Sequence, residues 1–137
     1  MTIFVDTSAL FAYYDADDES HSVIVPLWEA LVWSRVSLLT TNYVLLEAAS
    51  LFQRRLGLPW LQRLHTEARP LLDVVWVDDE LHDLAMVATL AADRRRLTIV
   101  DHLSFETMRR FGIRYALAFD EHFQERGYEL PPLPAPE

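Results

Sequence analysis

The sequence predicts a three-layer α/β domain in which a central parallel sheet of five strands is flanked by helices. Short runs of Val, Ile, Leu and Phe recur along the chain and alternate with stretches that have helical spacing. Strands that alternate with helices pair in parallel, because each helix supplies the crossover between them. A chain of 137 residues is long enough to bury its own core. We expect one domain over residues 1–130, followed by a proline-rich tail over residues 131–137.

The predicted strands are brief apolar runs, bounded by residues that favour turns or helix caps. The first begins almost at the initiator methionine, and the last is followed by an aspartate. Their length and apolar content are typical of strands buried on both faces of a parallel sheet. The strands are expected at residues 3–5, 36–39, 74–77, 97–100 and 115–119.

The predicted helices are bounded by recognisable caps and stops. Thr7 or Ser8 suits the N-cap of the first helix, and Thr41 or Asn42 suits that of the third. Gly57 ends the third helix, as glycine commonly does. An acidic loop separates the first two helices. The helices are expected at about residues 8–14, 21–34, 42–56, 58–69, 78–93, 103–111 and 121–126.

The composition excludes several kinds of chemistry. There is no cysteine, so disulfides, thiolate metal sites and cysteine nucleophiles are absent. All 12 basic residues are arginine, which excludes a catalytic lysine, and 21 acidic residues give a net charge of −9. Such a negative charge by itself disfavours the binding of nucleic acid, whose phosphates are also negative. No basic segment precedes the first apolar run, and the longest apolar stretch, residues 23–33, is too short to span a bilayer, so we expect a cytoplasmic protein with no membrane segment.

Acidic residues follow several of the predicted strands. Asp6, Asp101 and Asp120 come after the first, fourth and fifth strands. The carboxyl ends of parallel strands lie at one edge of a sheet, where α/β domains bind ligands. Glu47 lies one to two turns into the helix that starts from the same edge, with Leu46 and Ala48 beside it. We therefore expect these carboxylates to converge.

Converging carboxylates repel one another unless a cation lies between them. Mg²⁺ or Mn²⁺ prefers oxygen ligands, and such a site suits hydrolysis of a phosphodiester. Each aspartate taken alone also suits a helix N-cap, and Glu47 alone could face solvent beside Arg54.

In four segments the chain resembles PIN-domain ribonucleases, and more narrowly the VapC toxins of bacterial and archaeal toxin–antitoxin pairs. The segments occur in the order and with the spacing typical of that family, and they span nearly the whole chain. They are Ile3-Phe4-Val5-Asp6-Thr7-Ser8-Ala9-Leu10, Thr40-Thr41-Asn42-Tyr43-Val44-Leu45-Leu46-Glu47, residues 97–108 around Asp101, and Ala118-Phe119-Asp120-Glu121-His122-Phe123.

The resemblance implies a Mg²⁺- or Mn²⁺-dependent endoribonuclease that a cognate antitoxin blocks, and a chain that forms homodimers. It places Asp6, Glu47, Asp101 and Asp120 at the metal as the catalytic acids, and gives Thr7 and Ser8 the task of orienting a carboxylate or water. Ala118 departs from the pattern, since many relatives carry Thr or Ser there, and its methyl group supplies no hydroxyl.

The remaining polar residues have less specific roles. Arg54, seven residues after Glu47, either meets substrate phosphate or is a surface arginine. Residues 94–96 are expected in a solvated turn at the opposite sheet edge, and His102 and His122 on the surface. Apolar residues around 51–52 and 58–61 exceed what one helix face needs and are candidate dimer contacts.

Two other classes of function share features with this sequence. Phosphoryl-acceptor domains, such as response-regulator receivers and haloacid-dehalogenase-type phosphatases, also place acids at strand ends, but they rely on a lysine that this chain lacks. A PIN fold that has lost activity and binds RNA or protein as an adaptor remains an alternative, although all four acids are present.

Overall fold

A computed structural model describes residues 1–135 and contains a parallel sheet with helices on both sides. The strands are β1 (Thr2–Val5), β2 (Ser37–Thr41), β3 (Asp73–Val75) and β4 (Tyr115–Leu117). The helices are α1 (Thr7–Tyr14), α2 (His21–Trp33), α3 (Asn42–Arg55), α4 (Leu58–Arg63), α5 (Asp79–Ala92), α6 (Ile99–Phe111) and α7 (Glu121–Glu125). The predicted three-layer α/β class is confirmed.

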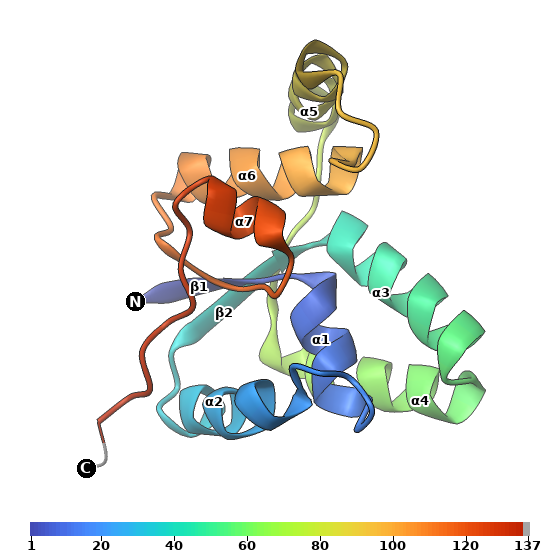
Figure 1. Cartoon of the computed structure of the whole chain (residues 1–137), viewed down its shortest axis with the longest axis vertical. Coiled ribbons are helices and arrows are strands. Elements are labelled where there is room, and N and C mark those ends of the chain that lie inside the picture. The colour runs from blue at the N-terminus through green and yellow to red at the C-terminus, as the bar shows by residue number, and fades with distance from the viewer. Residues whose placement is uncertain (136–137) are drawn as a thin grey trace.

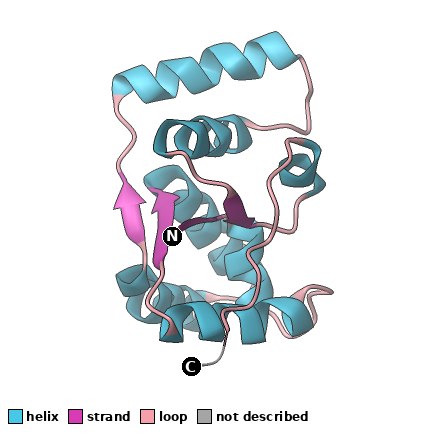
Figure 2. Ribbon diagram, turned by 90° about the vertical axis from the view of Figure 1, so that its left-hand side faces the viewer, coloured by secondary structure: helices cyan, strands magenta, loops and turns pink. Residues whose placement is uncertain are grey.

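The strand order is β3-β2-β1-β4, and every pair in the sheet is parallel. Ile3, Phe4 and Val5 of the central strand are completely buried, as a strand covered on both faces requires. In Figure 1, α5, α6 and α7 lie on one side of the sheet, and α1, α2 and α4 lie on the other. Figure 2 shows the same layering from the side.

The chain reverses its direction across the sheet at β1. The first three strands step outward from β1, whereas β4 pairs with the other side of β1. Such a switch point opens a crevice beyond the carboxyl ends of the two strands, and α/β domains bind their ligands there. Asp6 directly follows β1 and Asp120 lies three residues beyond β4, so the topology directs both to this crevice.

The predicted strand at residues 97–100 is wrong, and the sheet among residues 1–135 has four strands rather than five. Thr98 caps α6, and a capping box joins it to Asp101: each side chain accepts a hydrogen bond from the other residue's backbone N–H. A four-residue apolar run does not distinguish a strand from the start of a buried helix, and the capping box decides for the helix. Asp101 is therefore in the first turn of α6 and not at the end of a strand.

Smaller differences concern element ends. The helix expected over residues 58–69 is interrupted: a π-helical turn (Leu64–Ala68) and a 3-10 turn (Arg69–Leu71) follow α4. Just before the tail, the chain lies beside the sheet, where Ala116 N donates to Glu129 O at 2.9 Å. The last two residues of the predicted tail, 136–137, lie outside the described residues. Within residues 1–135, none of the helices combines the length and apolar character that crossing a membrane requires.

Candidate active site

Asp6 is the N-cap of α1 and is almost completely buried. Its Oδ2 accepts hydrogen bonds from Ser8 N at 3.2 Å and from Ser8 Oγ at 2.6 Å. The same hydroxyl oxygen accepts from Phe119 N at 3.0 Å, so Ser8 joins the ends of β1 and β4. Burial raises the pKa of Asp6 to about 7; the Ser8 hydrogen bonds oppose this shift, and the charges of Asp101 and Glu47 add to it.

Asp101 reaches the same region from the first turn of α6. Its Oδ2 accepts from Thr98 N at 3.0 Å and from Thr98 Oγ1 at 3.2 Å. Only 8% of the residue is exposed. Burial raises the pKa of Asp101, the Thr98 hydrogen bonds oppose the shift, and the charge of Asp120 adds to it. The carboxylate is thus held at a fixed orientation in a place that disfavours its charge.

Asp120 is the N-cap of α7, and its Oδ1 accepts from His122 N at 3.0 Å. Asp6 and Asp120 are therefore N-caps and Asp101 belongs to a capping box, and these roles are compatible with a metal site. In each case the capping hydrogen bonds use one carboxylate oxygen, and within residues 1–135 the other oxygen has no hydrogen-bond donor. The caps orient the carboxylates and leave one oxygen of each for a ligand.

Glu47 lies in the second turn of α3 and is exposed, as is its neighbour Leu46 at 69%. The apolar residues beside Glu47 in the sequence therefore do not enclose it, and Glu47 stands at the open rim of the site. Protein packed around its carboxyl group nevertheless raises the pKa, the Thr7 side chain opposes the shift, and the charges of Asp101 and Asp120 add to it. Thr7 itself is buried, and its hydroxyl donates to Val44 O at 3.5 Å.

Three side chains in the described part of the chain are close enough to share one metal ion. Asp101, Asp120 and His122 each offer a ligand atom, and these atoms lie within 4.8 Å of one another. The charges of nearby acids raise the pKa values of Asp6 and Glu47, but neither residue is part of this group. The structure therefore brings two of the four predicted acids into one cluster and adds a histidine that the sequence did not identify.

The comparisons with known proteins agree with this geometry. The family model described as "PIN domain" matches residues 3–127. The chain belongs to the PIN-domain family. It is similar to "23S rRNA-specific endonuclease VapC20" from two strains of Mycobacterium tuberculosis, with 34% identity over 92% of this chain and 95% of the relative. The crystal structure of that VapC20, described as a sarcin-ricin loop cleaving toxin, gives a TM-score of 0.81 at 32% identity over the same shares of both chains.

Membership of a nuclease family disfavours the adaptor alternative. The similar proteins are named as endonucleases, and the match covers nearly their whole length. PIN nucleases depend on metal, and the donor set fits that requirement: it is dominated by carboxylate oxygens, which hard divalent cations prefer. The first turns of α1, α6 and α7 also meet at the aspartates. Their partial positive charges offset part of the repulsion among the carboxylates.

The predicted positions of two histidines in this PIN domain are wrong. His102 and His122 are 3% and 8% exposed, rather than on the surface. Asp120 caps a helix of only five residues, and Phe123 must be buried, so the short helix turns His122 inward as well. The Asp-x-His spacing at a helix start was the one signal of this in the sequence.

The arginine turn at residues 94–96 is exposed, as predicted, but it is not at the opposite edge of the sheet. Since residues 97–100 do not form a strand, the chain does not cross the sheet between Arg96 and Asp101. Arg94 instead forms an ion pair at 3.2 Å with Glu125, at the end of α7. The turn is thereby joined to the helix that carries His122.

Arg54 is exposed in the last turn of α3 and forms no ion pair among the described residues. It lies about 10 Å along the helix from Glu47, at 1.5 Å per residue. Glu47 lines a hollow of about 200 Å³ together with Tyr43 and Ser50. Ala118 is buried and supplies no hydroxyl to the site.

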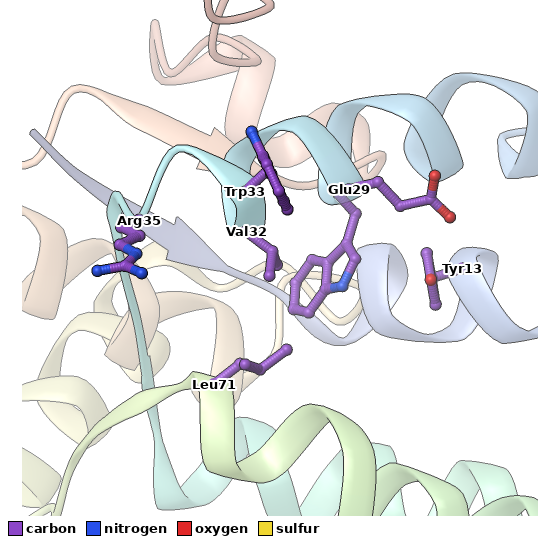
Figure 3. A pocket seen from close by; sticks show the side chains of 7 residues that line it. Tyr13, Glu29, Val32, Trp33, Arg35 and Leu71 are labelled. Carbon is purple, nitrogen blue, oxygen red and sulfur yellow. The ribbon is translucent and has the colours of Figure 1, made fainter.

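A larger hollow, of about 540 Å³, is separate from these groups. Figure 3 shows Tyr13, Trp33 and Leu71 around it, with Glu29 and Arg35 at its margin. Trp33 is 89% exposed there. None of the four acids lines this hollow, so it is not part of the candidate active site.

Proposed function

We propose that this chain is a metal-dependent endoribonuclease toxin of the VapC type, and that Asp6, Glu47, Asp101 and Asp120 are its catalytic acids. The observation that carries the proposal is a set of three aspartates near one switch point, two of them helix N-caps and one in a capping box. Within residues 1–135, each has one carboxylate oxygen that accepts no hydrogen bond. Mg²⁺ or Mn²⁺ is the proposed ion, because both prefer such oxygen donors. We further propose one domain over residues 1–130, acting in the cytoplasm.

The proposed reaction is attack of water on an RNA phosphodiester, with cleavage of the bond from phosphorus to the leaving oxygen. A bound ion supplies an activated water and neutralises charge on the phosphate. Asp6, Asp101 and Asp120 hold their carboxylates ready for the ion. Glu47, at the open rim and with a raised pKa, is the fourth proposed metal-site acid, and it is also our candidate to accept the proton of the attacking water. Ser8 fixes Asp6, and Thr7 lies beneath Glu47.

The substrate proposed for this site is a loop of structured RNA, with 23S rRNA as the first candidate because the similar proteins are named for it. Arg54 is proposed to contact a phosphate of the RNA. It is exposed, and it lies one turn along α3 from Ser50, which lines the hollow beside Glu47. The net charge of −9 would otherwise repel RNA. Bound cations at the carboxylates and this arginine counter that repulsion locally.

A cognate antitoxin is the proposed protein partner. The site is a partly buried group of carboxylates with raised pKa values, and a basic side chain from a partner would favour their charged forms. An antitoxin segment that carries such a side chain would occupy the position of the cation and of the RNA phosphate together. Inhibition would follow without any change in fold.

A homodimer through α5 is the proposed assembly. α5 lies at the margin of the molecule over α6 (Figure 1), and Leu84, Val87 and Leu90 on its outer face are 42%, 66% and 72% exposed. In an antiparallel pair centred on Val87, Leu84 of one copy meets Leu90 of the other. Glu80 then faces the arginine turn, residues 94–96, of the second copy, so charge and apolar surface are both complementary. Phe52, a candidate contact from the sequence, is buried in the core.

Cleavage of a 23S rRNA hairpin loop tests the proposed function. We expect cleavage in the presence of Mn²⁺ or Mg²⁺, and a chelator should abolish it. Asp101→Asn should lower the cleavage rate by at least about 100-fold, as the loss of other groups that stabilise charge in a transition state does. Asp17→Asn is the matched control, since Asp17 is an exposed acid in the loop before α2. Equal cleavage by wild type and Asp101→Asn would overturn the assignment.

A further inference from the structure

His122 has the features of a buried ligand without a partner. Its side chain is 10% exposed, and neither ring nitrogen forms a hydrogen bond within residues 1–135. Nδ1 is fully inaccessible to solvent, whereas Nε2 lies 3.8 Å from Asp120 Oδ1 and faces the carboxylates. Nearly all buried polar atoms in proteins are hydrogen-bonded, so an unpartnered imidazole beside two carboxylates requires an explanation.

A carboxylate lies close to the other ring nitrogen of this histidine. Glu125 Oε2 lies 3.8 Å from His122 Nδ1, one turn further along α7. The same oxygen accepts from Arg94 Nη1 at 3.2 Å, which holds the Glu125 side chain at the end of α7. A small rotation of the partly exposed Glu125 would bring it within hydrogen-bond distance of Nδ1. Histidines that bind metals usually donate their second N–H to a carboxylate in this way.

We propose that His122 binds the catalytic cation through Nε2, with Glu125 accepting from Nδ1–H, and that this nitrogen donor makes the site selective for Mn²⁺ over Mg²⁺. The inference rests on the proposed function, because it concerns the same ion. Asp101, Asp120 and His122 supply two oxygens and one nitrogen from positions that lie within 4.8 Å of one another. Mg²⁺ prefers oxygen donors alone, whereas imidazole suits transition metals.

The alternative explanation of His122 is simple packing against its neighbours. His102 provides the comparison within the same fold: it is also buried with an unpartnered Nε2, but it is outside the group of three ligand atoms. Its ring packs edge-on against Phe105, and no carboxylate forms an ion pair with it in the described chain. His102 is therefore the matched control for the effect of changing a buried histidine.

The direct test is pulsed electron paramagnetic resonance of Mn²⁺ bound to the full chain. We expect spin-echo modulation from a directly coordinated ¹⁴N in wild type and in His102→Gln, and its loss in His122→Gln, which places an amide oxygen near the position of Nε2. Binding titrations should show the ratio of Mn²⁺ to Mg²⁺ affinity falling about tenfold in His122→Gln, within the range known for perturbed metal ligation. Glu125→Gln should lower Mn²⁺ affinity by a similar factor, whereas Glu121→Gln, an exposed acid of the same helix, should not.

Two results would overturn the inference. One is bound Mn²⁺ without ¹⁴N modulation in wild type; the other is an unchanged Mn²⁺ to Mg²⁺ ratio in a folded His122→Gln protein. If either occurs while metal-dependent RNA cleavage persists, the proposed function stands and His122 is a packing residue. Failure of both ions to bind wild type, together with absence of cleavage, would overturn the proposed function as well.

Discussion

Replacing Asp6 with asparagine should stabilise the metal-free protein at high pH. Burial raises the pKa of Asp6 from 3.8 to about 7. Between those values the folded state holds a proton that the unfolded state has lost, so the free energy of unfolding falls as pH rises through this window. At 1.36 kcal/mol per pKa unit, the full penalty is at most about 4 kcal/mol, and roughly 2–3 kcal/mol of it arises between about pH 5 and pH 8.

The asparagine of the Asp6→Asn variant would retain the structural part of the aspartate's role. Its amide oxygen can accept from Ser8 N and Ser8 Oγ as Asp6 Oδ2 does, and asparagine is as good an N-cap as aspartate. The change therefore removes the charge and little else. We expect Asp6→Asn to exceed wild type in stability by about 2–3 kcal/mol more at pH 8 than at pH 5.

Urea unfolding in the presence of a chelator measures this difference. Asp17→Asn, which removes an exposed acid, should show no such dependence on pH. Added Mn²⁺ should raise the stability of wild type by mass action, and should raise that of Asp6→Asn less because one of the proposed catalytic acids has lost its charge. A gap between Asp6→Asn and wild type that is the same at both pH values would refute the reasoning, because Asp6 would then titrate normally in the folded state.

Three further predictions concern other contacts. Ser8→Ala removes the hydroxyl between Asp6 and Phe119 N and should cost about 1–3 kcal/mol of unfolding free energy in thermal or urea denaturation, with Ser50→Ala, an exposed serine on α3, as control. Arg54→Ala should weaken RNA binding and reduce its salt dependence by about one ion in filter-binding titrations, with Mn²⁺ affinity unchanged; an unaltered salt slope would contradict a phosphate contact. Val87→Glu should convert a dimer to a monomer in light scattering, whereas Val23→Glu, at an exposed site on α2, should not.

The sheet was predictable because its two central strands are mostly buried and contain short apolar runs, Ile3-Phe4-Val5 in β1 and Leu38-Leu39 in β2. The same rule failed at residues 97–100, where Ile99 and Val100 look like a strand and are the first turn of α6. Local pattern cannot separate these two outcomes over four residues. The capping pair of Thr98 and Asp101 was visible in the sequence and would have decided between them.

The convergence of the acids could be anticipated from topology, since a parallel sheet brings residues after its strands to one edge. Asp101 shows that the result does not depend on the strand itself. The first turn of a helix that lies across the sheet reaches the same crevice, so the sequence led to the right residue through a wrong element.

Burial could not be anticipated in the same way. Glu47 lies between Leu46 and Ala48 in the sequence, but only Ala48 is buried. The buried face of α3 consists of Val44, Ala48 and Phe52, so Leu46 and Glu47 face solvent. His122 was expected at the surface and is enclosed because Phe123 packs against Phe105 and Phe4. These outcomes depend on contacts between segments distant in sequence, which spacing along one helix does not contain.

The hydrogen bonds at the helix starts explain how the carboxylates can repel one another and still be well ordered before a cation binds. Ser8, Thr98 and the backbone of His122 fix one oxygen of each aspartate through bonds internal to the fold. Repulsion among the carboxylates is relieved by a proton on Asp6, whose pKa of about 7 lets it be held or released at neutral pH. A cation that replaces this proton meets oxygens already oriented for it, so the ordering entropy of the ligands is spent during folding and not during binding.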